Sequence, residues 1–373
     1  MPRFLHTADW QIGRQFGQFE PDDAIPLAEA RFAAVERLAA LAAEHKVDAV
    51  LVAGDVFDSQ TVSDRTVRRL FNALSAFQGP WIMIPGNHDA ALAESVWTRA
   101  MRLGAVPASV RVAVQPQALA FPESGFAILA APLTQRHTYT DLTEWFEDAE
   151  TAPGLLRIGL AHGSVQGILA EDIDSTNPIA QDRAARARLD YLALGDWHGT
   201  KRIDARTWYS GTPEQERFKA NDAGQVLLVE IEAAAAEPRV NAVRIGQFQW
   251  QALEKVITVP SDVDNLLASF DQISAADVIN LHLSGQVDLA SHQRVRAAMG
   301  EFEARARSFT VDMSTLRLSP TAEDIAALKA DGYLGEVIAE LRDQQGDEAE
   351  LAQNAMEILT GLLAEGLPQG SRA

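Results

Sequence analysis

The feature that most constrains the fold is a series of short apolar runs, each of which ends in a polar segment. Residues 47–53, for example, are almost entirely apolar and stop at Gly54, which Asp55 follows. Runs of this length are typical of buried strands, and the stretches between several of them have the spacing of amphipathic helices. The alternation predicts an α/β layered domain with functional loops at the carboxyl ends of its strands.

Five of these polar segments contain side chains that bind metal ions. Carboxylate, amide and imidazole groups on successive strand ends can converge in space, and this mixture suits a pair of divalent cations. The expected chemistry is phosphoester cleavage. The five segments are Asp9-Trp10-Gln11, Gly54-Asp55-Val56-Phe57-Asp58, Gly86-Asn87-His88-Asp89, His162-Gly163 and Gly195-Asp196-Trp197-His198.

Composition limits the class of protein. The chain of 373 residues is 47% hydrophobic and 23% charged, so two or three packed units are expected. It has no cysteine, which excludes a disulfide framework and a thiolate zinc site. No run approaches about 18 consecutive apolar residues, and no apolar leader precedes the first motif. We therefore expect no signal peptide and no membrane span, and predict a cytoplasmic protein.

The formal net charge of −20 argues against nucleic acid at first, because affinity for DNA comes mainly from Lys and Arg that neutralise phosphates. The acidity is unevenly spread, since residues 321–373 contain eleven Asp or Glu against three Lys or Arg. Bound cations would offset the charge of the candidate metal ligands. The 27 Arg against 5 Lys suit bidentate phosphate contacts, although a compositional bias of the genome explains that ratio equally well.

The strand and helix patterns predict three regions. Residues 1–237 form the α/β domain, and the sequence AAAAEP at 233–238 marks its end. Residues 238–318 read as a small α+β domain, and residues 319–373 as an acidic helical segment that begins with a capping-box-like turn. An apolar stripe in this last segment packs on the chain itself or binds a partner, and the first is the preferred interpretation. The stripe comprises Leu351, Ala355, Ile358, Leu359 and Leu362.

The ordered set of motifs resembles the calcineurin-like metallophosphoesterase superfamily, whose motifs are D-x-H, G-D-x-x-D, G-N-H-D/E, a single H and G-H-x-H. Within it, the sequence is most similar to the SbcD-type DNA repair nucleases. The closer similarity lies in HTADWQIG at 6–13, LALGDWHG at 192–199 and YSGTPE at 209–214. The resemblance covers residues 6–214 and implies a layered β-sandwich flanked by helices, with a small capping domain at 238–318.

The resemblance also implies a role for each matching position. Two metal ions would share Asp55, and each would have three further ligands. His88 would contact the substrate phosphate and be held by Asp89, while Asp58 would orient one of the ligands. The implied metal ligands are Asp9, Gln11, Asp55 and His198 for one ion, and Asp55, Asn87, His162 and Asp196 for the other.

Two positions depart from the family pattern, because Gln11 and Asp196 stand where the family has histidines. One interpretation is a decayed site in a protein that only binds a partner. Both replacements retain an oxygen donor, however, and the other ligand positions remain filled. Replacing nitrogen by oxygen makes the site harder and favours Mn²⁺ over zinc, with magnesium less suited. We therefore expect a working centre with two divalent ions, most favourably Mn²⁺.

Trp10 and Trp197 lie between candidate ligands, and either ring could stack an unpaired base, but we prefer the interpretation that both face the core. Arg65 and Arg69 are candidate phosphate contacts, with solvated helix surface as the equal alternative.

The resemblance implies a manganese-dependent DNA nuclease acting in repair. Family members work with an SbcC-type ATPase, and related bacterial enzymes are encoded beside an Lhr-type helicase and cut single strands. The second type is slightly preferred here. A small-molecule phosphodiesterase and a non-catalytic interaction module remain as competing functions.

Overall fold

The computed structural model describes residues 1–168, 176–319, 321, 333–344, 351–352, 354–356, 358–359 and 362. The chain divides into two compact units, Met1–Phe248 and a second unit that begins at Gln249. The division into three domains at 237/238 and 318/319 stays a prediction. The first unit contains all five metal-ligand segments and is described first.

One sheet of the first unit has the strand order β14-β13-β1-β2-β3-β4. Its strands β1 to β4 are parallel, whereas β13 is antiparallel to β1 and to β14. The last strand falls within the predicted small domain, yet pairs along its whole length with β13. The strands are β1 (Arg3–Thr7), β2 (Ala49–Ala53), β3 (Trp81–Ile84), β4 (Val110–Val112), β13 (Gln225–Glu230) and β14 (Arg239–Arg244).

The other large sheet has the order β11-β12-β10-β7-β6-β5. Its four central strands are parallel, and both edge strands are antiparallel to their neighbours. A two-stranded sheet pairs β8 (Ser164–Val165) with β9 (Pro178–Ile179). The strands of the large sheet are β5 (Gln117–Phe121), β6 (Phe126–Ala131), β7 (Leu156–His162), β10 (Tyr191–Gly195), β11 (Lys201–Arg202) and β12 (Thr207–Tyr209).

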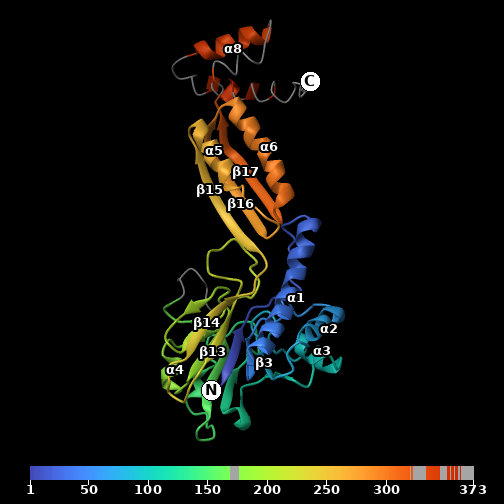
Figure 1. The fold of residues 1–373 in the computed structure, drawn as a ribbon, viewed down its shortest axis with the longest axis vertical. Helices are drawn as coiled ribbons and strands as arrows, with labels where there is room; N and C mark the ends of the chain where they lie inside the picture. Colours follow the sequence, from blue (N-terminus) through green and yellow to red (C-terminus); the bar gives the residue numbers. More distant parts are fainter. Residues whose placement is uncertain are drawn as a thin grey trace. The chain divides into compact units, whose positions relative to one another are not determined.

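The two large sheets pack face to face, and helices cover the outer face of the first sheet. Leu51 and Ile82 of the first sheet share an apolar core with Ile128 and Ile158 of the second. Figure 1 shows α1, α2 and α3 on one side of the first unit, where Val50 belongs to the core that these helices cover. The helices are α1 (Pro21–Glu44), α2 (Asp64–Ala73), α3 (Val96–Arg102) and α4 (Arg183–Arg186).

Burial on both faces explains why the central strands are continuous apolar runs, as parallel strands in layered proteins usually are. The predicted layered β-sandwich flanked by helices is confirmed. The edge strand β5 was not predicted: its sequence QALAF has only four consecutive apolar residues, and in the structure residues 117–121 alternate between half-buried and exposed positions. Among the described residues, no helix has the length and apolarity needed to cross a bilayer.

The second unit contains a parallel three-stranded sheet in the order β15-β16-β17. Two helices cover one face, where Leu281 and Leu283 pack with Val263 and Val295. The strand and helix order agrees with the α+β pattern predicted for this part of the sequence. The elements are β15 (Gln249–Ile257), α5 (Pro260–Ser269), β16 (Asp277–Val287), α6 (Leu289–Arg305), β17 (Ser308–Leu318) and, further along the chain, α8 (Tyr333–Asp343).

A buried histidine joins the two large sheets. His6 of β1 places Nδ1 2.9 Å from the hydroxyl of Tyr191 and Nε2 3.2 Å from the carbonyl oxygen of Leu194, both on β10. Burial lowers the pKa of His6 to about 3, despite the opposing effect of the Leu194 carbonyl. The imidazole is therefore neutral in the folded protein and serves as a hydrogen-bonding link between the layers.

This link makes stability depend on pH. The unfolded chain binds a proton at His6 near pH 6.5 and the folded chain does not, so stability is lost as the pH falls below 6.5. We expect the advantage of the wild type over His6→Asn, from urea unfolding with EDTA present, to shrink by about 1.4 kcal/mol per pH unit between pH 6.5 and 5. A difference that is constant over this range would show that His6 is protonated when folded.

Candidate metal centre

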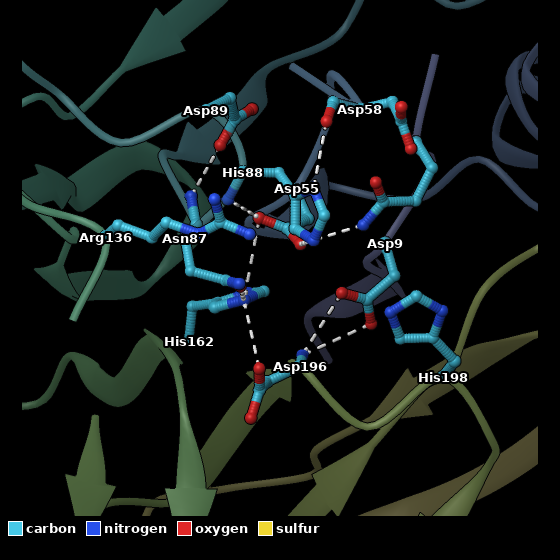
Figure 2. Close-up of polar contacts among 12 residues, drawn as sticks. Asp9, Asp55, Asp58, Asn87, His88, Asp89, Arg136, His162, Asp196 and His198 are labelled. Carbon is cyan, nitrogen blue, oxygen red and sulfur yellow. Dashed lines mark hydrogen bonds and ion pairs between the residues drawn. The ribbon is translucent and has the colours of Figure 1, made fainter. Parts of the chain in front are cut away.

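The carboxyl ends of five strands from both large sheets meet at one place. Asp9 follows β1 and Asp55 follows β2, which pair in parallel, while His162 ends β7 beside Gly195 of β10. One ligand atom from each of Asp9, Asp55 and His162 lies within 4.8 Å of the others, and all three side chains are buried. Figure 2 shows them pointing toward a common centre.

The backbone at this centre is strained. Asp9, Gln11, Asp55 and Asp196 have positive φ angles of 54°, 48°, 53° and 102°. Residues other than glycine rarely adopt this left-handed backbone conformation. Those that do concentrate at functional sites, where the surrounding structure enforces the conformation. Two hydrogen bonds enforce it here, from the amide of Asp9 to the carbonyl of Gly54 and from the amide of Gln11 to the carbonyl of Asp55, both 3.0 Å.

Glycines allow the ligands to come this close. A Cβ atom on Gly86 would lie 2.2 Å from Oδ1 of Asp55, and one on Gly54 would lie 2.3 Å from Nδ1 of His162. Gly54 also has a φ of 90°, which a larger residue would adopt only with strain. Each of these two glycines therefore leaves the space that a specific ligand side chain occupies.

The electrostatics of the centre fit a cation. Burial, aided by the carboxylates of Asp55 and Asp196, raises the pKa of Asp9 to about 6 against the lowering effect of His198 and His162. Burial alone would lower the pKa of His162, but Asp55, Asp196 and Asp9 outweigh it and raise that pKa to about 9. The protein thus stabilises positive charge at this place, which is the condition for binding metal ions.

The other predicted ligands surround these three. Oδ1 of Asn87 lies 2.8 Å from Nε2 of His162, and Oδ1 of Asp196 lies 3.7 Å from the same atom. The Gln11 side chain donates from Nε2 to Asp55 at 2.8 Å, whereas its buried Oε1 has no hydrogen-bond partner in the described parts of the chain. An unpaired buried oxygen is costly, and a cation would satisfy it.

Hydrogen bonds at Nδ1 turn the Nε2 atoms of two histidines toward the centre. Nδ1 of His162 lies 2.8 Å from the carbonyl oxygen of Ala53, and Nδ1 of His198 lies 2.5 Å from a carboxylate oxygen of Glu216. Each Nδ1 donates to that oxygen, which leaves Nε2 as the atom available to a metal. Figure 2 shows the ring of His198 beside Asp9.

His88, Asp89 and Asp58 share the loops around Asp55. The amide of His88 donates to Asp55 at 2.9 Å, and its Nδ1 lies 2.9 Å from the backbone carbonyl of Asp58. The Asp58 carboxylate instead pairs with Arg14 at 3.4 Å. The family resemblance implied that Asp89 holds His88, but the structure shows a different role for Asp89. Its buried carboxylate accepts from the amides of Val56, Phe57 and Gly86, at 2.9, 3.2 and 2.7 Å, and so fixes the loops after β2 and β3.

The candidate substrate contacts lie in different surroundings. Trp10 is buried, donates to Thr7 at 2.9 Å and packs edge-on against Trp81, so no face of its ring is open to a base. Trp197 is only half-buried, and the ammonium groups of two lysines lie 5.2 and 4.3 Å from its ring centre. Arg65 and Arg69 are exposed on α2, and Arg69 forms an ion pair with Glu29.

Two residues that the sequence did not indicate, Arg31 and Glu216, contact the loop of Gln11 and the side chain of His198. Arg31 of α1 is buried and donates to the carbonyl oxygens of Trp10 and Gln11 at 2.8 and 3.2 Å. It also pairs at 3.0 Å with the buried Glu216, whose other carboxylate oxygen contacts His198. The only available signal was a charged residue among the apolar positions on one face of α1.

The Arg31–Glu216 pair makes a prediction about stability. Arg31→Ala would leave the Glu216 charge buried with weaker partners, and breaking a buried ion pair costs about 3–5 kcal/mol. The exposed pair of Arg102 and Glu94 provides the control, because Arg102→Ala should cost less than about 1 kcal/mol. Chemical denaturation of both variants measures the two costs, and equal costs would show that the buried pair has no special role.

Comparisons with known proteins place this site in a family. Residues 2–229 match the family model of calcineurin-like phosphoesterases. The chain is 39% identical over 94 residues to the SbcD component of the nuclease SbcCD of Rhodobacter capsulatus. The aligned segment covers 24% of this chain and 22% of that protein. It is 28% identical over 284 residues to the DNA double-strand break repair protein Mre11 of Aeropyrum pernix, with 68% and 63% covered.

A third relative, the SbcD component of the nuclease SbcCD of Bacillus subtilis, is 24% identical over 337 residues, with 79% of this chain and 83% of that protein covered. The chain spans less than two thirds of the first two relatives. The family model, in contrast, spans more than half of this chain and includes every predicted ligand. The resemblance seen in the five motifs is thus confirmed, and the chain belongs to the calcineurin-like phosphoesterase family.

Proposed function

We propose that this protein is a manganese-dependent DNA nuclease of the repair system, which hydrolyses phosphodiester bonds with two metal ions and cuts single-stranded DNA internally. The observation that carries the proposal is the convergence of Asp9, Asp55 and His162 from two sheets at a buried, strained centre. Strain of this kind persists only where the surrounding structure enforces it. A decayed site would have had no reason to keep it.

The ligand set supports Mn²⁺. Asp9, Gln11, Asp55 and His198 would hold one ion, and Asp55, Asn87, His162 and Asp196 the other. These side chains offer mainly oxygen donors with two imidazoles, a mixture harder than a typical zinc site. The free Oε1 of Gln11 supports a direct contact with a cation.

The ions would supply Lewis acidity and lower the pKa of an attacking water. The chain's own residues would then position the substrate. His88 is 31% exposed in its side chain and is held at Nδ1 by the carbonyl of Asp58, so its Nε2 can present a proton to a phosphate or leaving oxygen. Asp89 accepts hydrogen bonds from both the loop of Asp55 and the loop of His88, and so fixes their relative positions.

The basic residues near the centre support a nucleic acid substrate. Two of the five lysines in the chain, Lys201 and Lys219, lie over the ring of Trp197. Trp197 stands in the sequence between the candidate ligands Asp196 and His198. In a chain of net charge −20, this placement concentrates cations where a strand would pass. We assign this cluster to phosphate contacts rather than base stacking, because ammonium groups already lie near the ring.

A protein partner also belongs to the proposal. Two relatives are named as the SbcD component of the nuclease SbcCD, and we infer that this chain assembles with an SbcC-type ATPase or with a helicase. Three residues of the predicted C-terminal stripe support a partner, because Leu351, Ile358 and Leu362 are 70%, 65% and 63% exposed. This differs from the preferred expectation that the stripe packs on the chain itself. The helical segment is acidic, which suits a basic partner surface.

Single-stranded circular DNA tests the nuclease activity. With Mn²⁺ the wild type should convert circles to linear fragments, which shows internal cutting directly. Asp55→Asn should lower the rate by more than about 100-fold, since even partners of metal ligands typically contribute about 10–100-fold. Asp64→Asn, which changes a carboxylate on α2 that is 58% exposed, is the control. Hydrolysis of bis-p-nitrophenyl phosphate without cleavage of any DNA would instead indicate a small-molecule phosphodiesterase.

His88 can be separated from the metal ligands. His88→Ala should lower DNA cleavage by about 10²–10⁴-fold, the usual contribution of a general acid. It should keep the rise in melting temperature that Mn²⁺ produces in EDTA-treated protein, because a bound ion stabilises the folded state. Loss of that rise would make His88 a ligand, and unchanged cleavage would remove it from the mechanism. A wild type whose melting temperature ignores Mn²⁺ would support a non-catalytic module.

A further inference from the structure

A cavity of about 380 Å³ opens beside the metal centre, on the side of Asn87 and His88. Its size is within the range of pockets that hold small organic ligands or parts of larger ones. The two-metal proposal gives a role to Asn87 and His88 but none to Arg136 or Leu92 of the same lining. Its lining comprises Asn87, His88, Asp58, Gln60, Leu92 and Arg136, with Ser59 and Ala90.

Arg136 is the basic group of the lining. It lies in the segment after β6, and Figure 2 shows its side chain extending toward Asn87 and His88. The residue is exposed, and among the described residues no ion pair joins its guanidinium to a carboxylate. The Asp58 carboxylate of the same lining is paired with Arg14. With respect to the described residues, Arg136 is therefore available for an anion that enters the cavity.

The backbone of Arg136 is fixed to the metal centre. The side chain of Asn177 donates to the carbonyl of Arg136 at 3.3 Å and accepts from the amide of Thr138 at 2.8 Å. Asn177 is buried, has a φ of 62°, and its carbonyl accepts from Ser164 at 2.9 Å. A Cβ on Gly163, the residue after the ligand His162, would lie 2.2 Å from that carbonyl. Asn177 thus joins the loop of Arg136 to the loop of His162.

The cavity also has an apolar wall. Leu92 is 41% exposed, and it lines the same cavity as Arg136. A guanidinium with an apolar surface nearby matches a nucleotide, whose phosphate is anionic and whose sugar and base have apolar faces. A ligand that consisted of phosphate alone would make no use of the apolar surface of Leu92.

We propose that this cavity is a nucleotide subsite, in which Arg136 binds the phosphate next to the scissile one and Leu92 contacts the sugar or base between them. The proposal rests on the proposed function, since it requires a substrate with successive phosphates. Arg136 is then a residue that determines specificity. It favours a nucleic acid strand over a small phosphodiester, which has a single phosphate.

Calorimetry on the full chain with Mn²⁺ tests the subsite without requiring DNA cleavage. The probes are thymidine 3′,5′-bisphosphate, which offers two phosphates, and thymidine 5′-monophosphate, which offers one. We expect Arg136→Gln to weaken the bisphosphate by about tenfold to a hundredfold, the value of a hydrogen bond to a charged group. Binding of the monophosphate should change by less than about twofold, because it needs only the metal centre.

Two controls separate this role from a structural one. Arg111→Gln changes an exposed arginine on β4 and should alter neither affinity. Hydrolysis of bis-p-nitrophenyl phosphate should keep its kcat and KM in Arg136→Gln, whereas KM for a single-stranded oligonucleotide should rise about tenfold or more.

The subsite is excluded if Arg136→Gln leaves the bisphosphate affinity unchanged, weakens both probes equally, or abolishes hydrolysis of bis-p-nitrophenyl phosphate. Failure of the wild type to bind either probe would exclude it as well. Failure to cut DNA, with the calorimetric difference retained, would overturn the nuclease proposal and leave the subsite in place for another substrate with two phosphates.

Discussion

The constraint on which the rest of the structure depends is the crowding of buried carboxylates at the strand ends. Asp9, Asp55 and Asp196 share a small volume with His162, and burial with mutual repulsion raises the pKa of Asp9 to about 6. Folding without a cation must tolerate this repulsion, and the hydrogen bonds of the loops hold the groups together against it. A bound cation would attract each carboxylate and so offset their mutual repulsion.

The buried pair of Arg31 and Glu216 stabilises the loops against the repulsion between these carboxylates. Arg31 places a buried positive charge beneath the carbonyls of Trp10 and Gln11, and Glu216 connects it to His198. The cationic neighbours, Arg31 first among them, outweigh burial and lower the pKa of Glu216 well below its usual range, so this carboxylate stays ionised and continues to accept from His198. Helix α1, which forms the outer layer, is therefore part of the site as well as of the core.

The sequence was sufficient for the central strands and for the residues of the ordered motifs, and insufficient for contacts between segments that match no motif. Apolar runs gave the central strands because both of their faces are buried, and the order of Asp9, Asp55, Asn87, His162 and His198 indicated the centre. The partner of Arg31 lies 185 residues away at Glu216, and no spacing rule connects them. The role of Asp89 was missed for a similar reason, because its carboxylate binds backbone amides of another loop, which carry no sequence signal.

Charge distribution reconciles an acidic chain with the anionic substrate that we propose. The net charge of −20 would repel DNA at a distance, and this repulsion is screened within about 8–10 Å at physiological ionic strength. At contact, the local groups decide: Lys201 and Lys219 lie beside Trp197, and Arg136 lies beside Asn87. Two divalent ions would add four positive charges at the centre. We therefore expect binding to be strong only where a strand reaches the centre itself, because the net negative charge opposes contact with nucleic acid elsewhere.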